Sequence, residues 1–185
     1  MLYVGYRRGT KPGSSAELWF NADRKENMRF LCFPATLLCV LMTPAWADFA
    51  AGLSAYQKGD FATAMKEWRP IAENGDAAAQ FNLGLMYYDG QAVPQDYAQA
   101  ANWFLRSAEQ DYEKAQLNLG AMYGVGKGVK RDYVQAYKWL NLCAAKGDSK
   151  CSEQRDLVAK KLSASKLAAA QKLATEFTPK KKSEN

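Results

Sequence analysis

The chain contains an internal repeat with an offset of 36 residues. The segment that begins at Ala79 reads AQFNLGLMYYDG, and the segment that begins at Ala115 reads AQLNLGAMYGVG. The second halves of the two segments agree as well, in the pairs Asp96/Asp132, Tyr97/Tyr133, Gln99/Gln135, Ala100/Ala136, Trp103/Trp139 and Ala108/Ala144. Such a period indicates an array of similar units, each of which buries its apolar face against its neighbours.

Each unit is predicted to consist of two helices. In the second unit the apolar residues of both helices follow a helical spacing, at Ala79, Leu83, Met86 and Tyr87 and then at Ala100, Trp103 and Ala108. Gly90 and Pro94 indicate the turn between the helices. Asp96 is predicted to cap the second helix, with Gln99 completing a capping box, and Asp132 with Gln135 repeats this pattern.

Two glycines inside the predicted first helices, Gly84 and Gly120, each lower helix stability by ~1 kcal/mol. Because they recur at the same place, we expect each to make room for a bulky Trp or Tyr of a neighbouring helix. Residues 48–76 form a related but shorter unit. Residues 149–178 are predicted to form a capping helix pair, and Ser163 is expected to cap its final helix.

The motifs "AQFNLGLMY", "YGVGKGVKRDYVQA", "WL" and "AAKG" resemble the Sel-one-like repeat (SLR) family, which is related to tetratricopeptide repeats. The resemblance covers residues 48–148, with full units at 77–112 and 113–148. The unit at 48–76 lacks the Gly-rich turn and looks closer to a plain tetratricopeptide repeat. The resemblance implies an all-α fold, a short right-handed α-solenoid of helix-turn-helix repeats with a concave face.

An uncharged apolar run precedes the repeats, from Phe30 to Ala47. Arg29 stands before it and Ala-Trp-Ala ends it, which predicts a signal peptide over 28–47 that is cleaved between Ala47 and Asp48. The alternative is an uncleaved membrane anchor. Residues 1–27 show no motif and are read as a non-native or disordered leader, or as a genuine cytoplasmic tail. Either way, the repeats are expected to be periplasmic or secreted.

Cys143 and Cys151 are expected to lie on either side of one helix-helix turn. If the protein is exported, its compartment is oxidising and a disulfide between them is favoured. The cysteine-rich secreted branch of the SLR family is similar, because it pairs cysteines at this spacing between adjacent helices. The alternative is two buried thiols in place of the alanines usual in the family.

The tetratricopeptide register that the resemblance supplies places eight first-helix residues in the concave groove. They are Phe49, Leu53, Tyr56, Phe81, Leu85, Tyr88, Leu117 and Ala121. An apolar, aromatic groove suits a peptide or a partner helix. The alternative is that these side chains pack in the core between adjacent first helices.

No catalytic or metal site is expected. The chain contains no His, which excludes His-containing zinc sites and Ser-His-Asp catalysis. Ser163 and Lys166 match the S-x-x-K motif of penicillin-recognising enzymes, without the SDN and KTG motifs. The Gly-rich segment 124–128 lacks the GK[ST] ending of a phosphate loop.

The net charge of +6 does not lie on the repeats. Residues 1–29 contribute +3, the segment 179–185, read as a basic disordered tail, contributes +2, and the repeats contribute +1. Nucleic acid is therefore not an expected partner, and a membrane is expected only through an uncleaved leader.

The sequence thus favours an exported scaffold that binds another protein, with no cofactor and no enzymatic activity. The alternatives are a weak β-lactam hydrolase or penicillin-binding protein of the cysteine-rich SLR type, and a protein associated with peptidoglycan or the cell envelope.

Overall fold

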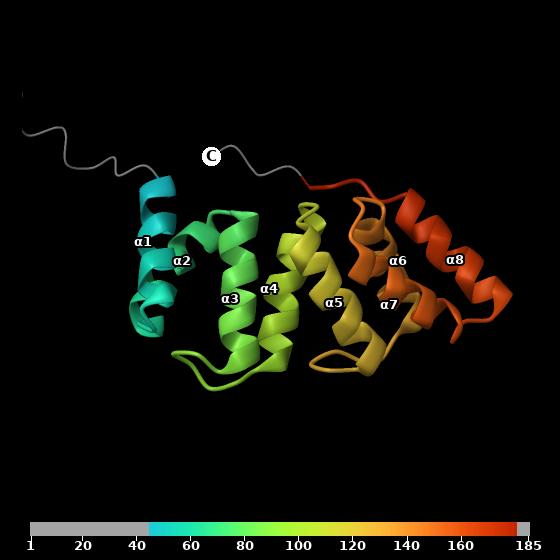
Figure 1. Cartoon of the computed structure of the whole chain (residues 1–185), viewed down its shortest axis with the longest axis horizontal. Helices are drawn as coiled ribbons and strands as arrows, with labels where there is room; N and C mark the ends of the chain where they lie inside the picture. The colour runs from blue at the N-terminus through green and yellow to red at the C-terminus, as the bar shows by residue number, and fades with distance from the viewer. Residues whose placement is uncertain (1–44, 181–185) are drawn as a thin grey trace, which may run out of the picture. The chain divides into compact units, whose positions relative to one another are not determined.

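The computed structural model describes residues 45–180, which belong to one compact unit. This part of the chain folds into eight α-helices without a strand (Figure 1). The helices are α1 (Ala45–Gln57), α2 (Phe61–Glu73), α3 (Ala77–Asp89), α4 (Tyr97–Glu109), α5 (Glu113–Val125), α6 (Tyr133–Ala144), α7 (Ser149–Ala159) and α8 (Ala164–Thr175).

Each helix from α1 to α6 packs against the next one along the chain, and α8 packs against α6. Residues 45–180 therefore build up by stacking neighbours, and helices α1 to α5 follow one another from left to right in Figure 1, with α8 at the far end. This arrangement confirms the predicted all-α solenoid. Within the described residues, no helix is long and apolar enough to cross a membrane.

The predicted leader at 1–27 lies outside the described residues. The predicted signal peptide at 28–47 does so as well, except for its last three residues, which form the start of α1. The predicted cleavage point between Ala47 and Asp48 thus falls within the first turn of this helix.

The predicted helix caps are confirmed at three places. The Asp96 side chain accepts hydrogen bonds from the backbone N–H groups of Ala98 and Gln99, at 2.9 and 3.0 Å. Asp132 caps α6 in the same way, and Ser163 caps α8. The predicted capping box is incomplete, however, because the Asp96 N–H donates to the Tyr87 carbonyl at 2.9 Å instead of meeting the Gln99 side chain.

The glycines inside the first helices do make room for a neighbouring side chain, but the neighbours differ from the expected Trp or Tyr. A Cβ atom at Gly84 would lie 2.6 Å from Cδ1 of Phe104. A Cβ atom at Gly120 would lie 2.7 Å from Cγ of Leu140. Phe104 and Leu140 occupy the same position in successive repeats, so the same contact is made by side chains of different size.

The core consists of two clusters of buried side chains. Trp68, Leu83 and Met86 belong to the first, and Phe104 and Leu119 belong to the second. Each cluster contains side chains from at least two helix pairs. The apolar face of one pair is therefore buried only when the next pair packs against it.

The chain turns back onto the repeats after α8. The Phe177 ring packs edge-on against Trp139 of α6, with ring centroids 5.6 Å apart. Lys180, which the sequence places in a basic tail, donates from its backbone N–H to the Glu109 carbonyl at 2.8 Å and pairs with the Glu109 carboxylate at 2.7 Å. These contacts hold residues 177–180 against α4 and α6.

Candidate binding pocket and groove

A disulfide joins α6 to α7. The sulfur atoms of Cys143 and Cys151 are bonded, their Cα atoms are 5.7 Å apart, and both residues are fully buried. Asp148 begins α7 by accepting a hydrogen bond from the Cys151 N–H at 3.0 Å. The predicted pairing is confirmed. The Asp148 carboxylate lies close to both sulfurs, but metal binding would need thiolates that the disulfide removes.

The predicted groove residues on α1 are only partly available. Phe49 and Tyr56 are half-buried and lie against the Trp68 ring, with centroid distances of 5.9 and 5.5 Å. Leu53 is 41 % exposed. On this helix, therefore, the two aromatic residues pack on Trp68, and Leu53 is the most exposed of the three groove residues.

Phe81 does not line an open groove, and the structure corrects this expectation. Its side chain is only 8 % exposed. The ring lies 5.7 Å from Phe104 and 5.3 Å from Tyr112, centroid to centroid. Phe81 is thus a core residue that joins its own helix pair to the next one, as the alternative interpretation of the groove residues held.

Leu85 and Tyr88 are half-buried and pack on the second core cluster. The Tyr88 ring lies 5.2 Å from Tyr97 and 6.5 Å from Phe104. The rings of Tyr88, Tyr97 and Phe104 fill the space beside α3, between the two helices of this repeat.

Lys127 covers the same aromatic pair. Its amine lies 4.3 Å from the centroid of Tyr88 and 4.0 Å from that of Tyr97, and it donates a hydrogen bond to the Tyr88 hydroxyl at 3.0 Å. Hydrogen bonds to the Tyr88 and Tyr97 hydroxyls raise the pKa of Lys127, because they favour the ammonium form. The loop after α5 is thereby fastened over α3 and α4.

The backbone of this loop requires its glycines. Gly128 has a φ of 70°, and a Cβ atom there would lie within 2.1 Å of the Tyr97 carbonyl oxygen. The Gly-rich segment therefore serves close packing of the turn on the preceding repeat.

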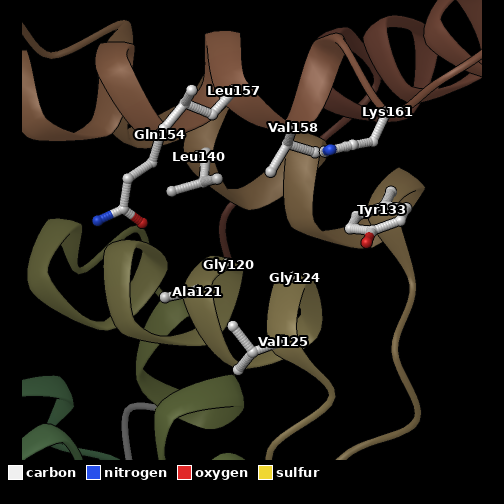
Figure 2. Close-up of a pocket in the computed structure, with 10 residues that line it drawn as sticks. All are labelled: Gly120, Ala121, Gly124, Val125, Tyr133, Leu140, Gln154, Leu157, Val158 and Lys161. Atoms are coloured by element: carbon white, nitrogen blue, oxygen red, sulfur yellow. The ribbon is translucent and has the colours of Figure 1, made fainter.

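An apolar pocket of about 300 Å³ opens between α5 and α7 (Figure 2). The residues that line it are Gly120, Ala121, Gly124, Val125, Tyr133, Leu140, Gln154, Leu157, Val158 and Lys161. Figure 2 shows the side chains of α7 facing those of α5, with Leu140 of α6 between them. Ala121 belongs to both the predicted groove and the pocket, whereas Leu117 is half-buried on α5 and does not line the pocket.

Small residues on α5 keep this pocket open. A Cβ atom at Gly124 would find its nearest neighbours at 3.9 Å, in Ala136, and at 4.0 Å, in Val158. A Cβ atom at Gly124 would therefore make only ordinary contacts, whereas a Cβ atom at Gly120 would clash with Leu140. Two exposed apolar side chains flank the opening: Val125 is 71 % exposed and Leu157 is 61 % exposed.

The polar groups of the pocket lie at its ends. Tyr133 and Lys161 are at one end and Gln154 is at the other (Figure 2). The Arg131 guanidinium lies 5.7 Å from the centroid of the Tyr133 ring. Lys161 is the one charged side chain of the pocket lining, so the positive charge of the lining lies at the Tyr133 end.

Ser163 has a structural role in the S-x-x-K segment. Its hydroxyl oxygen accepts a hydrogen bond from the backbone N–H of Lys166 at 3.4 Å, which is the N-cap interaction of α8. Both residues are exposed on the protein surface. Capping of α8 therefore accounts for the presence of a serine at position 163.

Most of the pocket residues were not among those predicted from the sequence. A comparison of the two full repeats with each other would have indicated them. At the equivalent positions of the two full repeats, Leu85, Tyr88 and Phe104 become Ala121, Gly124 and Leu140. Every one of these changes removes side-chain volume on the same side of the helix pair.

The Sel1 repeat family model matches residues 77–112 and 113–148. Among solved structures, a protective antigen of uropathogenic Escherichia coli that displays an SLR fold is 34% identical, with a TM-score of 0.69, over 73% of this chain and 30% of the antigen. A Sel1 repeat protein from Oxalobacter formigenes is 32% identical, with a TM-score of 0.56, over 60% of this chain and 87% of that protein. The chain thus spans less than a third of the antigen's length. No curated protein matches the chain.

Proposed function

Because this chain belongs to the Sel1 repeat family, whose members generally bind other proteins, we propose that it is an exported scaffold that binds a peptide or partner helix in its groove. The observation that carries the proposal is the apolar pocket between α5 and α7, together with the exposed Val125 and Leu157 at its opening. Exposed apolar side chains around a hollow are typical of surfaces that bind another molecule.

Two observations support a location outside the cytoplasm. The disulfide between Cys143 and Cys151 is of a kind that persists in oxidising compartments. The similar solved structure is described as a protective antigen. Export through the segment 28–47 is part of the proposal.

The rest of the groove would add contact area on α1, α3 and α5. Leu53 is exposed there, and Leu85 and Leu117 are half-buried. A partner would cover these side chains and would leave Phe81 in the core. We therefore propose a binding surface that runs from Leu53 to the pocket.

Site-specific photo-cross-linking in cells tests this proposal. A photoreactive amino acid is placed at Leu53 or Leu117 in the full chain, and at Leu173 of α8 as a matched control, since Leu173 is also a solvent-accessible apolar residue. We expect the two groove positions to give a cross-link to a defined protein and Leu173 to give none. Equal cross-linking at all three positions, or none at the groove positions, would contradict the proposal.

A further inference from the structure

We propose that the pocket between α5 and α7 binds a peptide in which a bulky apolar side chain is followed by carboxylates. The inference rests on the proposed scaffold function and specifies where in the groove the partner is anchored and which chemistry it presents. The observations that carry it are the volume of the pocket, its apolar lining and the unpaired Lys161 at one end.

The volume sets the size of the anchor. Pockets that bind small molecules and cofactors measure about 300–1,000 Å³, so a pocket of about 300 Å³ is at the lower limit. It suits one large side chain, such as Leu or Phe, better than an extended cofactor. Leu140 would form the base for this side chain, and Leu157 and Val158 would form one wall.

The anchor would bury apolar surface that is now exposed to solvent. Val125 and Leu157 are the two most exposed of the large apolar side chains in the described part of the chain, and both line this pocket. Burial of apolar area contributes roughly 25 cal/mol per Å² before the costs of binding are subtracted. An apolar side chain seated between them would thus provide the main favourable term.

The charge at the pocket indicates which residues next to the anchor would bind favourably in the peptide. Lys161 is the one charged side chain among the residues that line the pocket, and it lies at the Tyr133 end. Within residues 45–180 Lys161 forms no ion pair. The open end therefore favours carboxylates.

The preceding repeat shows how the pocket can be closed without damage to the fold. At the position of Gly124 it carries Tyr88, whose ring packs on Tyr97 and Phe104. A Cβ atom at Gly124 would make only ordinary contacts, at 3.9 Å or more, and Gly124 lines the pocket, so we expect Gly124→Tyr to direct its ring into the pocket. Replacing a helical glycine also favours the helix. Gly124→Tyr is thus a blocking variant that is expected to fold.

The test uses three fluorescent peptide pools and measures anisotropy with the full chain. The first pool carries Leu or Phe followed by two Glu, the second replaces Glu with Lys, and the third replaces the apolar residue with Ser. We expect the first pool to bind most tightly and its affinity to fall by about tenfold or more in Gly124→Tyr. Circular dichroism and urea unfolding would verify that this variant is folded.

Charge reversal tests the second half of the proposal. Lys161→Glu should weaken binding of the acidic pool by roughly fivefold to tenfold and improve binding of the basic pool. Lys166→Glu is the matched control, because Lys166 is an exposed lysine of α8 outside the pocket, and it should leave both affinities unchanged. Equal effects of Lys161→Glu and Lys166→Glu would show that the carboxylates of the peptide do not bind at Lys161.

The remaining outcomes are decisive as well. Binding of sodium dodecanoate, an apolar chain with one carboxylate, is measured directly in the absence of peptide. If it binds in a Gly124-dependent manner and no pool does, the occupant is an amphipathic lipid and the peptide proposal is wrong. If the acidic pool binds equally well to Gly124→Tyr, the pocket assignment fails. Cross-links at Leu53 and Leu117 would then still support the scaffold function, so the two failures are distinguishable.

Discussion

The two full repeats have nearly the same backbone and differ in what fills the space beside their first helix. In the α3–α4 repeat, which we call the closed repeat, Phe104 and Tyr88 fill this space and Lys127 lies across it. In the α5–α6 repeat, which we call the open repeat, Leu140 and Gly124 stand at the equivalent positions and a pocket remains. A repeat array can thus keep its helix packing constant and vary its binding surface by side-chain volume alone.

The largest expected effect concerns the buried aromatic residue of the closed repeat. Phe81→Asp should lower the free energy of unfolding by about 4 kcal/mol, because it leaves a cavity and buries a carboxylate against Phe104 and Tyr112. Urea unfolding followed by circular dichroism measures the change. The matched variant is Leu117→Asp at the half-buried equivalent position of the open repeat, where a loss of only about 1 kcal/mol is expected. Similar losses in both variants would show that the two positions are equally buried.

The second effect concerns the link between α6 and α7, which the closed repeat lacks. At the positions of Cys143 and Cys151 the preceding repeat junction carries Ser107 and Ala115. Reduction of the disulfide should cost about 2–3 kcal/mol of unfolding free energy in the chain-entropy view of a short loop.

Unfolding in urea with and without a reductant measures this effect. The double variant Cys143→Ala and Cys151→Ala is the control, because its stability should not respond to the reductant. Since α6 and α7 both line the pocket, reduction should also weaken binding of the acidic peptide pool. A reductant effect on the double variant would point to a cause other than this disulfide.

The third effect compares two glycines of one helix. Gly120→Ala should lower stability by about 1–2 kcal/mol, because its Cβ would lie 2.7 Å from Leu140 and force the side chain to move. Gly124→Ala should raise stability by about 0.5–1 kcal/mol, because its Cβ makes only ordinary contacts with Ala136 and Val158 and the helix loses a glycine. Thermal and urea unfolding of the two variants would show opposite signs. Shifts of the same sign would contradict the different packing of the two positions.

The smallest effect concerns the lysine that covers the closed repeat. Lys127→Met should lower stability by about 0.5–1 kcal/mol, because the cation–π contacts with Tyr88 and Tyr97 are lost. Amide hydrogen exchange in the loop 126–131 should become faster. Lys130→Met, which alters an exposed lysine of the same loop, is the control and should change neither quantity. Faster exchange in both variants would show that the loop is held in another way.

The helices and their ends could be predicted because their causes are local. Asp96, Asp132 and Ser163 each satisfy backbone N–H groups two or three residues away, so the sequence alone indicates where the helices begin. The disulfide could be predicted for a similar reason, since one short turn brings Cys143 and Cys151 together.

The candidate site was predicted less well because burial depends on several helices at once. The tetratricopeptide register that the resemblance supplies placed Phe81 and Leu85 together in the groove and could not tell which of them neighbouring rings would cover. Phe81 is covered by Phe104 and by Tyr112, whereas Leu85 remains half-buried. The pocket escaped prediction because no single residue type marks an unfilled volume.

The sequence by itself determined the repeat, the helix pairs and their caps, and it favoured the cysteine pairing over two free thiols. These features follow from the 36-residue period, from helical spacing and from contacts between residues close in sequence. Only the tertiary structure decided that Phe81 is core and that a pocket opens above Gly124. The reason is that free volume is the difference between the space that three helices enclose and the side chains that α5, α6 and α7 place in it.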